Sequence, residues 1–377
     1  MKIVLDVNFP FGHAAGLEIW VEGLIDGLAC VDTENQYLIF GFFMRNFEER
    51  IKKIRIPRQE NFQLFVRRVP RPLIAFFENN NISIIERWLS GEKVDVFHGT
   101  GYFLPRLKKI KGIVTIHGLD FVEMDVYWYS DKWYKNVHNY LKRASIIIAV
   151  SEHVKNAIVQ HYGIERERIM VVYPGVRKEF MPLENTGNSE IFERFKISFP
   201  YLLTVATSVE RKNLKRLLDA FAILAGKNRD LKLFIAGDRS IQDKIVQQIQ
   251  QHKLENRVVF TGYLGAEQLA CLYNMAEAFV FPSLYEGFGL PVLEAMACGC
   301  PVITSNVSAL PEVAGNAAIL VNPYSIEQLV EAMEKVLQSS YTRERMRMDG
   351  LKRAKDFSWE KSARQMIEVY HMVMNAD

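Results

Sequence analysis

Residues 281–303 read FPSLYEGFGLPVLEAMACGCPVI, which passes from apolar residues through a glycine-rich turn into a helical pattern. Proline is favoured at the first position of a helix, where its missing N–H costs nothing. A helix is therefore expected to begin near Pro291. The apolar run that ends at Phe281 predicts a strand, so the whole stretch predicts a strand, a loop and a helix in succession.

The same alternation of strand and helix recurs on both sides of this stretch. One set of expected strands spans residues 2–7, 37–43, 94–98, 112–116, 146–150 and 169–173, with a helix over 152–162. A second set spans residues 201–206, 231–236, 258–261, 278–281, 301–304 and 318–321. Short apolar runs separated by helical spans predict an α/β protein with parallel sheets. We expect two Rossmann-like, doubly wound domains that face a cleft.

The boundary between the two halves follows Pro174-Gly175, where the pattern becomes irregular. The expected parts are an N-terminal domain over residues 1–178, a linker over 179–198 and a C-terminal domain over 199–356. The amphipathic pattern of residues 357–377 predicts a final helix. Pattern alone leaves open whether this helix crosses back to the first domain or packs on the second.

The composition is that of an ordinary globular protein. The chain has 377 residues, 49% of them hydrophobic and 24% charged, which excludes a disordered chain and a single small module. No apolar run reaches the ~20 residues that span a bilayer, and Asp6 comes too early for a signal peptide. Four cysteines without a Cys-x-x-Cys pair predict a reducing, cytoplasmic setting. A net charge of +3 does not indicate a nucleic-acid partner.

Two acids flank the glycine-rich turn. Glu286 lies in the loop before the expected helix, and Glu294 lies about one turn inside it. A carboxylate is the usual partner of ribose hydroxyls, and backbone amides at a helix N-terminus bind phosphate. The amides expected to face such an anion belong to Gly287, Phe288, Gly289 and Leu290. The alternative, acids that only match the helix dipole, accounts for Glu294 alone.

The run from Glu286 to Glu294 resembles the signature of glycosyltransferase family 4, whose members are retaining enzymes with two Rossmann-like domains of the GT-B type. Segments 150–153, 205–221 and 305–315 resemble the same family. The resemblance implies that Arg211 and Lys212 bind the donor diphosphate. Many members carry an arginine where Thr207 stands here, so the phosphate role falls on these two cations.

Positive charge after a strand end also suits the reaction itself. Breaking a sugar–diphosphate bond leaves negative charge on the leaving group, and each preorganised donor aimed at that charge contributes ~2.7–4 kcal/mol. Arg211 and Lys212 can play this part. A solvated helix start is the alternative, although bases at that position oppose the helix dipole.

Two residues of the first half extend the resemblance. Gly16 follows Ala15 where the family has paired glycines, and it is the candidate contact to the donor phosphate and the acceptor. His117 ends a buried strand, as the family's histidine does, although Gly118 replaces the usual aspartate. The resemblance implies that His117 contacts the transferred sugar near the reacting carbon. An ordinary turn glycine and a structural histidine are the alternatives.

Basic residues gather in two stretches of the first half. Residues 106–111 hold four bases, and residues 50–71 hold eight against one acid, Glu60. The eight are Arg50, Lys52, Lys53, Arg55, Arg58, Arg67, Arg68 and Arg71. Such stretches bind anionic lipid headgroups or a lipid-diphosphate acceptor at ~1 kcal/mol per base near a charged surface. A solvated face is the alternative.

These features predict a hexosyltransferase that uses a nucleotide-diphosphate sugar and a glycan or lipid-linked acceptor, in the cytoplasm or at the inner face of the membrane. His117, Arg211, Lys212 and Glu286 are the catalytic candidates, with Glu286 on the sugar hydroxyls and Glu294 on the ribose. Resemblance to mannosyltransferase branches makes GDP-mannose the first expected donor and a UDP-sugar the second. No Asp-x-Asp or spaced histidine pair occurs, so no metal or further cofactor is expected. An epimerase or phosphorylase on the same scaffold and a non-catalytic sugar-binding protein are the alternatives.

Overall fold

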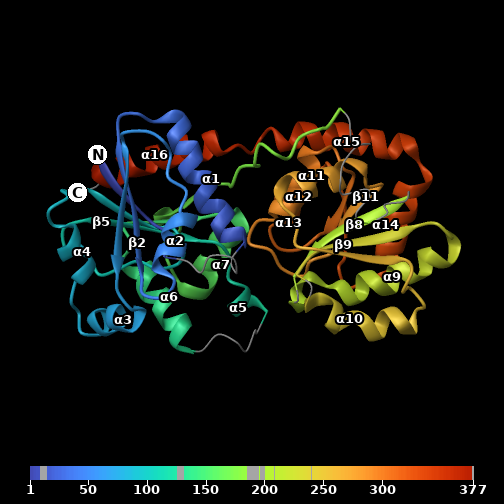
Figure 1. Cartoon of the computed structure of the whole chain (residues 1–377), viewed down its shortest axis with the longest axis horizontal. Coiled ribbons are helices and arrows are strands. Elements are labelled where there is room, and N and C mark those ends of the chain that lie inside the picture. The colour runs from blue at the N-terminus through green and yellow to red at the C-terminus, as the bar shows by residue number, and fades with distance from the viewer. Residues whose placement is uncertain are drawn as a thin grey trace. The chain divides into compact units, whose positions relative to one another are not determined.

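The computed structural model describes residues 1–8, 15–124, 131–184, 195, 200–207, 209–238 and 240–375. The chain divides into two compact units, each built on one sheet (Figure 1). Unit 1 holds residues 1–175 and 358–377, and unit 2 holds residues 176–357. Most of the segment expected to be a linker, residues 179–198, lies outside the described residues.

Unit 1 contains a seven-stranded sheet in the order β3-β2-β1-β4-β5-β6-β7. Its strands are β1 (Lys2–Asp6), β2 (Gln36–Phe43), β3 (Phe62–Arg68), β4 (Val96–Gly99), β5 (Lys111–Ile116), β6 (Ile146–Ala149) and β7 (Ile169–Val171). Every neighbouring pair is parallel, so the carboxyl ends of the strands share one edge. The strand order reverses between β1 and β4, and doubly wound sheets bind ligands at this switch point.

One strand of unit 1, β3, was not predicted. It lies inside the basic stretch of residues 50–71, and Phe62 is its one fully buried residue. β3 forms the edge of the sheet and pairs with β2, where Phe62 lies opposite Tyr37. Its apolar pattern is weak because an edge strand is only half covered, and charges at its end discourage pairing with other chains.

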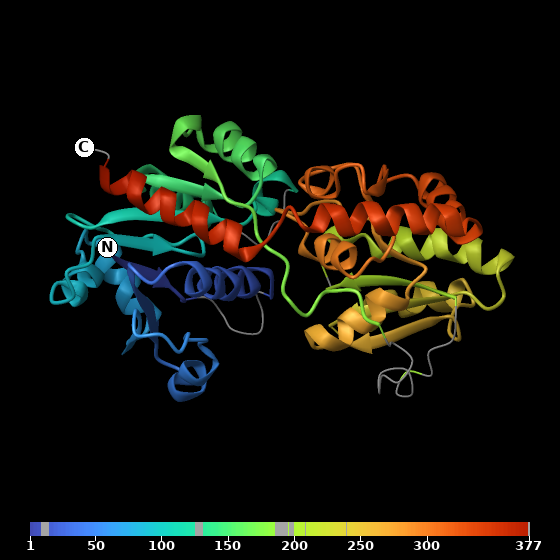
Figure 2. The same cartoon turned by 90° about the horizontal axis from the view of Figure 1, so that it is seen from above.

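The helices of unit 1 are α1 (Ala15–Val31), α2 (Phe47–Lys53), α3 (Arg71–Asn79), α4 (Ile84–Leu89), α5 (Asp120–Glu123), α6 (Asp131–Arg143), α7 (Glu152–Tyr162) and α16 (Trp359–Asn375). The last of these, α16, runs beside α1 (Figures 1 and 2). Gly23 and Gly27 of α1 face Trp359, and a Cβ at either glycine would collide with it. The hydroxyl of Tyr370 lies 2.9 Å from Nδ1 of His98 in β4. The end of the chain therefore completes the core of unit 1.

Unit 2 contains a six-stranded parallel sheet in the order β10-β9-β8-β11-β12-β13. Its strands are β8 (Tyr201–Ala206), β9 (Lys232–Gly237), β10 (Val258–Gly262), β11 (Ala278–Phe281), β12 (Val302–Ser305) and β13 (Ala318–Val321). Its helices are α9 (Leu214–Lys227), α10 (Ser240–Gln251), α11 (Ala266–Met275), α12 (Leu290–Ala297), α13 (Leu310–Ala314), α14 (Ile326–Gln338) and α15 (Ser340–Ala354). The switch point of this sheet lies between β8 and β11.

The prediction of two Rossmann-like parallel sheets is confirmed. Each strand expected from the sequence is present, and the helix predicted over residues 152–162 is α7. Both switch points have the same topology, since the first strand of each sheet lies between the second and the fourth. None of the described helices is long and apolar enough to cross a membrane.

Candidate active site

Two loops meet at the switch point of unit 2. The loop after β8 ends at Asn213, where α9 begins, and the loop after β11 runs over residues 282–289. The amide of Leu284 donates to the carbonyl of Arg211 (2.7 Å), and the side chain of Asn213 donates to the carbonyl of Pro282 (3.0 Å). These bonds tie the loop that carries the predicted cations to the loop that carries the predicted acid.

Both predicted cations contact Glu286. Nζ of Lys212 lies 2.7 Å from Oε1 of Glu286, and Nη1 of Arg211 lies 2.9 Å from the same oxygen. The hydroxyl of Ser283 donates to that oxygen as well (2.7 Å). Burial alone would raise the pKa of Glu286, but the charges of Lys212 and Arg211 lower it overall. Glu286 is therefore an ionised carboxylate that two cations share.

Lys212 lies in a more protected environment than Arg211. Its side chain is 10% exposed, against 28% for Arg211. Its Nζ lies 4.7 Å from the centroid of the Phe281 ring, a cation–π distance. A charge shielded from water acts more strongly on a nearby anion. Of the two cations, Lys212 should therefore have the larger electrostatic effect on a bound phosphate.

The glycine-rich turn leads directly into α12. The helix begins at Leu290, one residue before the predicted start. Gly289 has a φ of 117°, and a Cβ there would collide with a neighbouring leucine, so both backbone conformation and space require glycine. The ring of Phe288 packs edge-on against Phe357, with centroids 5.6 Å apart, and belongs to the core. The start of α12 places the positive end of a helix dipole at this edge of the sheet.

Glu294 lies about one turn inside α12 and is buried. Its Oε1 lies 3.2 Å from Nη2 of Arg177, whose guanidinium also stacks on Phe180 (5.0 Å to the ring centroid). Burial raises the pKa of Glu294 to about 7, although the charge of Arg177 opposes that rise. An acid with this pKa responds to small changes near neutral pH.

Three residues that the sequence did not single out support this edge. They are Arg177, Ser283 and Ser308. Ser283 and Arg177 contact the two acids directly, and the hydroxyl of Ser308 accepts from the amide of Glu286 (3.0 Å). Ser308 lies in segment 305–315, which the resemblance had marked without assigning it a role. Arg177 carried no signal, because it lies in an irregular segment 117 positions before its partner.

His117 lies directly after β5, at the carboxyl edge of the unit 1 sheet. Its Nε2 lies 2.6 Å from the carbonyl oxygen of Thr100, and its ring is edge-on to Trp20 at 5.2 Å. A carbonyl can only accept, so Nε2 carries the ring proton and Nδ1 is the acceptor nitrogen. Burial lowers the pKa of His117 to about 4. The ring is thus neutral near pH 7 and suits hydrogen bonding better than proton abstraction.

Gly16 is the second residue of α1 and is exposed. A Cβ at this position would meet no atom within 4 Å, so packing within unit 1 does not require glycine there. Ala14, which begins the segment of the predicted glycine loop, lies outside the described residues. Contacts within the described residues therefore give no reason for glycine at position 16.

A buried acid, Asp6, ends β1 at the unit 1 switch point. Its Oδ1 accepts a hydrogen bond from the amide of Asn8 (3.2 Å), and its carbonyl accepts one from the hydroxyl of Thr100. Burial raises the pKa of Asp6 to about 7. Sequence reasoning used Asp6 only to argue against a signal peptide, because one acid after a strand carries no further signal.

The basic stretch of residues 50–71 covers α2, β3 and the start of α3. Two arginines at the end of β3 stack on aromatic rings: Arg67 on Trp88 (5.6 Å) and Arg68 on Phe47 (5.8 Å). Both arginines remain exposed. In both cases the guanidinium itself lies over the ring, and a stacked guanidinium retains N–H donors for an anion.

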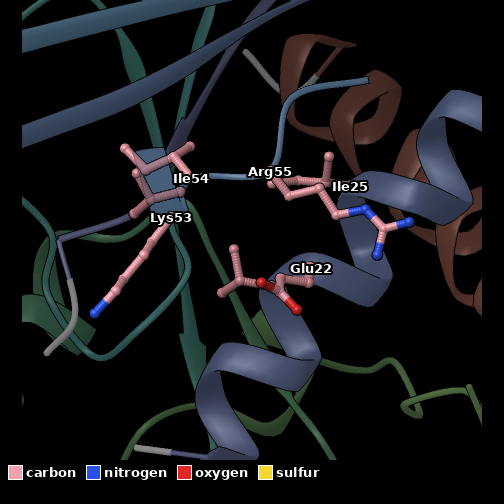
Figure 3. A pocket seen from close by; sticks show the side chains of 7 residues that line it. Glu22, Ile25, Lys53, Ile54 and Arg55 are labelled. Carbon is pink, nitrogen blue, oxygen red and sulfur yellow. The ribbon is translucent and has the colours of Figure 1, made fainter. Parts of the chain in front are cut away.

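A small recess lies between α1 and residues 53–55 (Figure 3). Figure 3 shows the Arg55 side chain extending toward α1, where its Nε pairs with Asp26 (3.1 Å). The recess is lined by Val7, Val21, Glu22, Ile25, Lys53, Ile54 and Arg55. It contains none of the predicted donor-binding residues, and two of the eight bases, Lys53 and Arg55, are already paired with acids.

The unit 2 edge therefore gathers two cations, two carboxylates and a helix start, which are groups suited to an anion and to hydroxyl donors. Among the residues that the structure describes, no group of three or more His, Cys, Asp or Glu side chains is placed to hold a metal ion.

Known proteins resemble this chain in sequence over most of its length. Residues 35–180 match the family described as "Glycosyltransferase Family 4", and residues 189–353 match "Glycosyl transferases group 1". O-antigen chain mannosyltransferase B of Escherichia coli is 31% identical over 285 residues, which is 74% of each chain.

Solved structures share the fold at lower identity. Sucrose-phosphate synthase from Thermosynechococcus elongatus is 21% identical and aligns over 100% of both chains with a TM-score of 0.80. Alr3699/HepE of Anabaena in complex with UDP and glucose is 17% identical, with a TM-score of 0.77 over 99% of this chain and 100% of that one. These two likenesses show the architecture alone.

Proposed function

We propose that this chain, which belongs to glycosyltransferase family 4, moves a hexose from a nucleotide-diphosphate sugar to a hydroxyl of a glycan or lipid-linked acceptor, with retention at the anomeric carbon. Family membership makes the protein a glycosyltransferase. One observation carries the finer proposal: Lys212 and Arg211 converge on Glu286 at the unit 2 switch point. Glu294 lies further along the helix that begins there.

The donor diphosphate binds to Lys212 and Arg211 and to the backbone amides of residues 287–290. The cations support this role because they follow the first strand of the sheet, where doubly wound folds bind nucleotides. The start of α12 supports it because helix N-termini attract phosphate. Glu294 accepts the ribose hydroxyls, and Glu286 accepts the hydroxyls of the hexose.

In the transfer step, the bond between the anomeric carbon and the β-phosphate oxygen breaks. The acceptor oxygen forms a new bond to that carbon on the same face, and the acceptor proton passes to the leaving phosphate oxygen. Negative charge grows on this oxygen, and Lys212 and Arg211 stabilise it. Because two cations supply this stabilisation, we propose that the reaction proceeds without a metal ion.

His117 contacts the transferred sugar as a hydrogen-bond acceptor. Its Nε2 is engaged by the carbonyl of Thr100, which leaves Nδ1 as the acceptor for a sugar hydroxyl. Gly16 lies at the start of α1, where the lack of a side chain allows close approach of the donor phosphate and the acceptor.

GDP-mannose is the proposed donor. The support is the similarity to O-antigen chain mannosyltransferase B, which extends over 74% of the chain. A UDP-sugar is the second choice, because the similar fold of Alr3699/HepE was solved with UDP and glucose.

The acceptor is proposed to lie at the cytoplasmic face of a membrane, which unit 1 meets through its basic stretch. Arg67 and Arg68 are exposed at the end of β3. On the neighbouring helix α3, Leu73 and Phe76 are 42% and 56% exposed. Exposed apolar side chains beside exposed bases favour a surface of anionic lipid.

The test is nucleotide release that depends on an acceptor. A thermal-shift panel of GDP-mannose, GDP-glucose, UDP-glucose and UDP-galactose first identifies the donor, since a ligand at 100 times its Kd stabilises by ~2.7 kcal/mol. We expect nucleoside diphosphate to appear only when a glycan acceptor is added, with an α-linked product by NMR. Donor turnover without acceptor would indicate an epimerase, and stabilisation without release would indicate a binding protein.

A further inference from the structure

The charges around Glu286 are shared unequally between its two oxygens. Lys212, Arg211 and Ser283 all contact Oε1, at 2.7, 2.9 and 2.7 Å. Oε2 has no hydrogen-bond partner among the residues that the structure describes. In the free protein, Glu286 thus occupies the two cations that a diphosphate needs, and it keeps one oxygen for a hydroxyl donor.

We propose that Glu286 makes the site select the intact nucleotide sugar over the spent nucleoside diphosphate. This inference rests on the proposed function and adds to it a means of rejecting the product. Lys212 and Arg211 are the cations for which Glu286 and the diphosphate compete.

The two ligands differ in charge where they meet these cations. In a nucleotide sugar the β-phosphate is a diester and carries one negative charge. In the free diphosphate it is terminal, and it carries nearly two at neutral pH because its second pKa is about 6. Glu286 already places a negative charge on both cations, and like charges repel strongly in a site shielded from water. The additional charge of the product therefore meets the larger repulsion.

The two ligands also differ in what they offer to Oε2. The hexose of the intact donor can present hydroxyl groups to this oxygen. The free diphosphate ends at its β-phosphate and has no hexose hydroxyl to offer. A buried site built to bond a hydroxyl discriminates strongly against a ligand that lacks one. Charge and hydrogen bonding thus act in the same direction.

The consequence concerns turnover. After transfer the hexose no longer engages Oε2, so Glu286 again competes fully with the phosphate for Lys212 and Arg211. Product release is thereby favoured at the moment when the site must be cleared. Nucleoside diphosphate should therefore inhibit the protein less than it would inhibit a site with the same two cations and no Glu286.

The principal test compares Glu286→Gln with wild type by isothermal titration against GDP and GDP-mannose, or the corresponding pair for the donor that the panel identifies. Glutamine has the shape of glutamate without its charge. We expect GDP to bind the variant roughly tenfold tighter than wild type, with GDP-mannose gaining much less or losing affinity. A ratio of the two affinities equal to that of wild type would overturn the inference.

The matched control is Glu210→Gln, which changes the net charge equally. Glu210 is exposed and lies two positions before Lys212, and it forms no ion pair with any residue that the structure describes. Its substitution should leave the affinity ratio as in wild type. An equal change in both variants would mean that net charge near the cations decides the ratio, which would also overturn the inference.

A second test needs no variant. The β-methyl ester of GDP lacks the additional charge of GDP and should bind wild type more tightly than GDP does, with that preference lost in Glu286→Gln. Equal binding of ester and GDP to wild type would contradict the charge argument. Failure of wild type to bind any nucleotide sugar or diphosphate would instead count against the proposed function.

Discussion

The switch points of the two units share one topology and differ in charge. In unit 2, the loops at this edge bring the cationic atoms of Lys212 and Arg211 within 3 Å of the same oxygen of Glu286. In unit 1, the corresponding edge holds His117, with a pKa near 4, and Asp6, with a pKa raised to about 7. The first edge is permanently charged, whereas the second holds a neutral histidine and an acid that is about half ionised near pH 7.

This contrast shows that the sheet supplies the place and the loops supply the chemistry. Parallel strands bring the ends of distant segments to one edge, whatever those segments contain. An edge with paired cations suits an anionic diphosphate, whereas an edge with a neutral histidine and one partly ionised acid suits sugar hydroxyls. Substitutions at each edge test whether the two edges differ in this way.

The largest effect is expected from Lys212→Ala at the charged edge. Loss of one preorganised cation should lower kcat/KM by roughly 10²–10³, equivalent to ~2.7–4 kcal/mol. Lys215→Ala is the control, since Lys215 is exposed on the neighbouring helix α9. Steady-state transfer assays and thermal unfolding measure both. Unchanged kcat/KM in a folded Lys212→Ala variant would remove the assigned role.

Glu294→Gln should make the protein more stable and should weaken donor binding. The pKa of Glu294 is raised by burial to about 7, so its ionisation is harder in the folded state than in the unfolded one. Its favourable contribution to stability is complete below pH 4.5 and is lost as the pH rises to about 7. At pH 8 the free energy of unfolding of the glutamine variant should therefore exceed that of wild type by ~1–3 kcal/mol, as measured by denaturant titration.

The same substitution has an opposite effect on the ligand. The carboxylate accepts ribose hydroxyls best when ionised, so donor affinity of wild type should rise with pH through about 7. In Glu294→Gln the affinity should be lower and this rise absent. Titrations at pH 6, 7 and 8 measure it, and a wild-type affinity that falls over this range would contradict the ribose assignment.

At the unit 1 edge, two substitutions of His117 should separate the roles of its two ring nitrogens. In His117→Gln the amide nitrogen takes the position of Nε2, which keeps donation to Thr100 but removes the acceptor at Nδ1. In His117→Asn the amide oxygen takes the position of Nδ1. One hydrogen bond is worth about 0.5–1.5 kcal/mol, so Gln should lower kcat/KM by up to roughly tenfold. If His117→Asn were more impaired than His117→Gln, the result would indicate that His117 has only a structural role.

A further effect is expected outside both edges, on membrane binding rather than on catalysis. Replacing Arg67 and Arg68 by Gln should weaken binding to liposomes that contain anionic lipid by ~1 kcal/mol per base. Binding of wild type should also fall as salt is raised. Co-sedimentation at low and high salt measures this. Salt-independent retention, or no binding by wild type, would leave the basic stretch as a solvated face.

Much of the charged edge was predictable because its parts are contiguous in the sequence. The turn at 286–290, the helix start and the pair Arg211-Lys212 each form a local pattern with a local physical reason. Arg177 could not be found in this way, since only folding brings it to Glu294. The edge strand β3 was missed for two reasons. Half-covered strands have a weak apolar pattern, and the bases of this segment favoured the interpretation as a basic surface.

The sequence alone determined every strand except the edge strand β3, and it determined which residues are chemically suited to phosphate, ribose and sugar. Apolar periodicity, glycine and proline act over a few residues, so the linear order is enough to read them. The tertiary structure decided which side chains share a charge. It placed three donors on one oxygen of Glu286, set the pKa values of Glu294 and His117 by burial, and packed α16 against Gly23 and Gly27. Burial and ion pairing depend on distances between remote segments, and only the folded chain sets those distances.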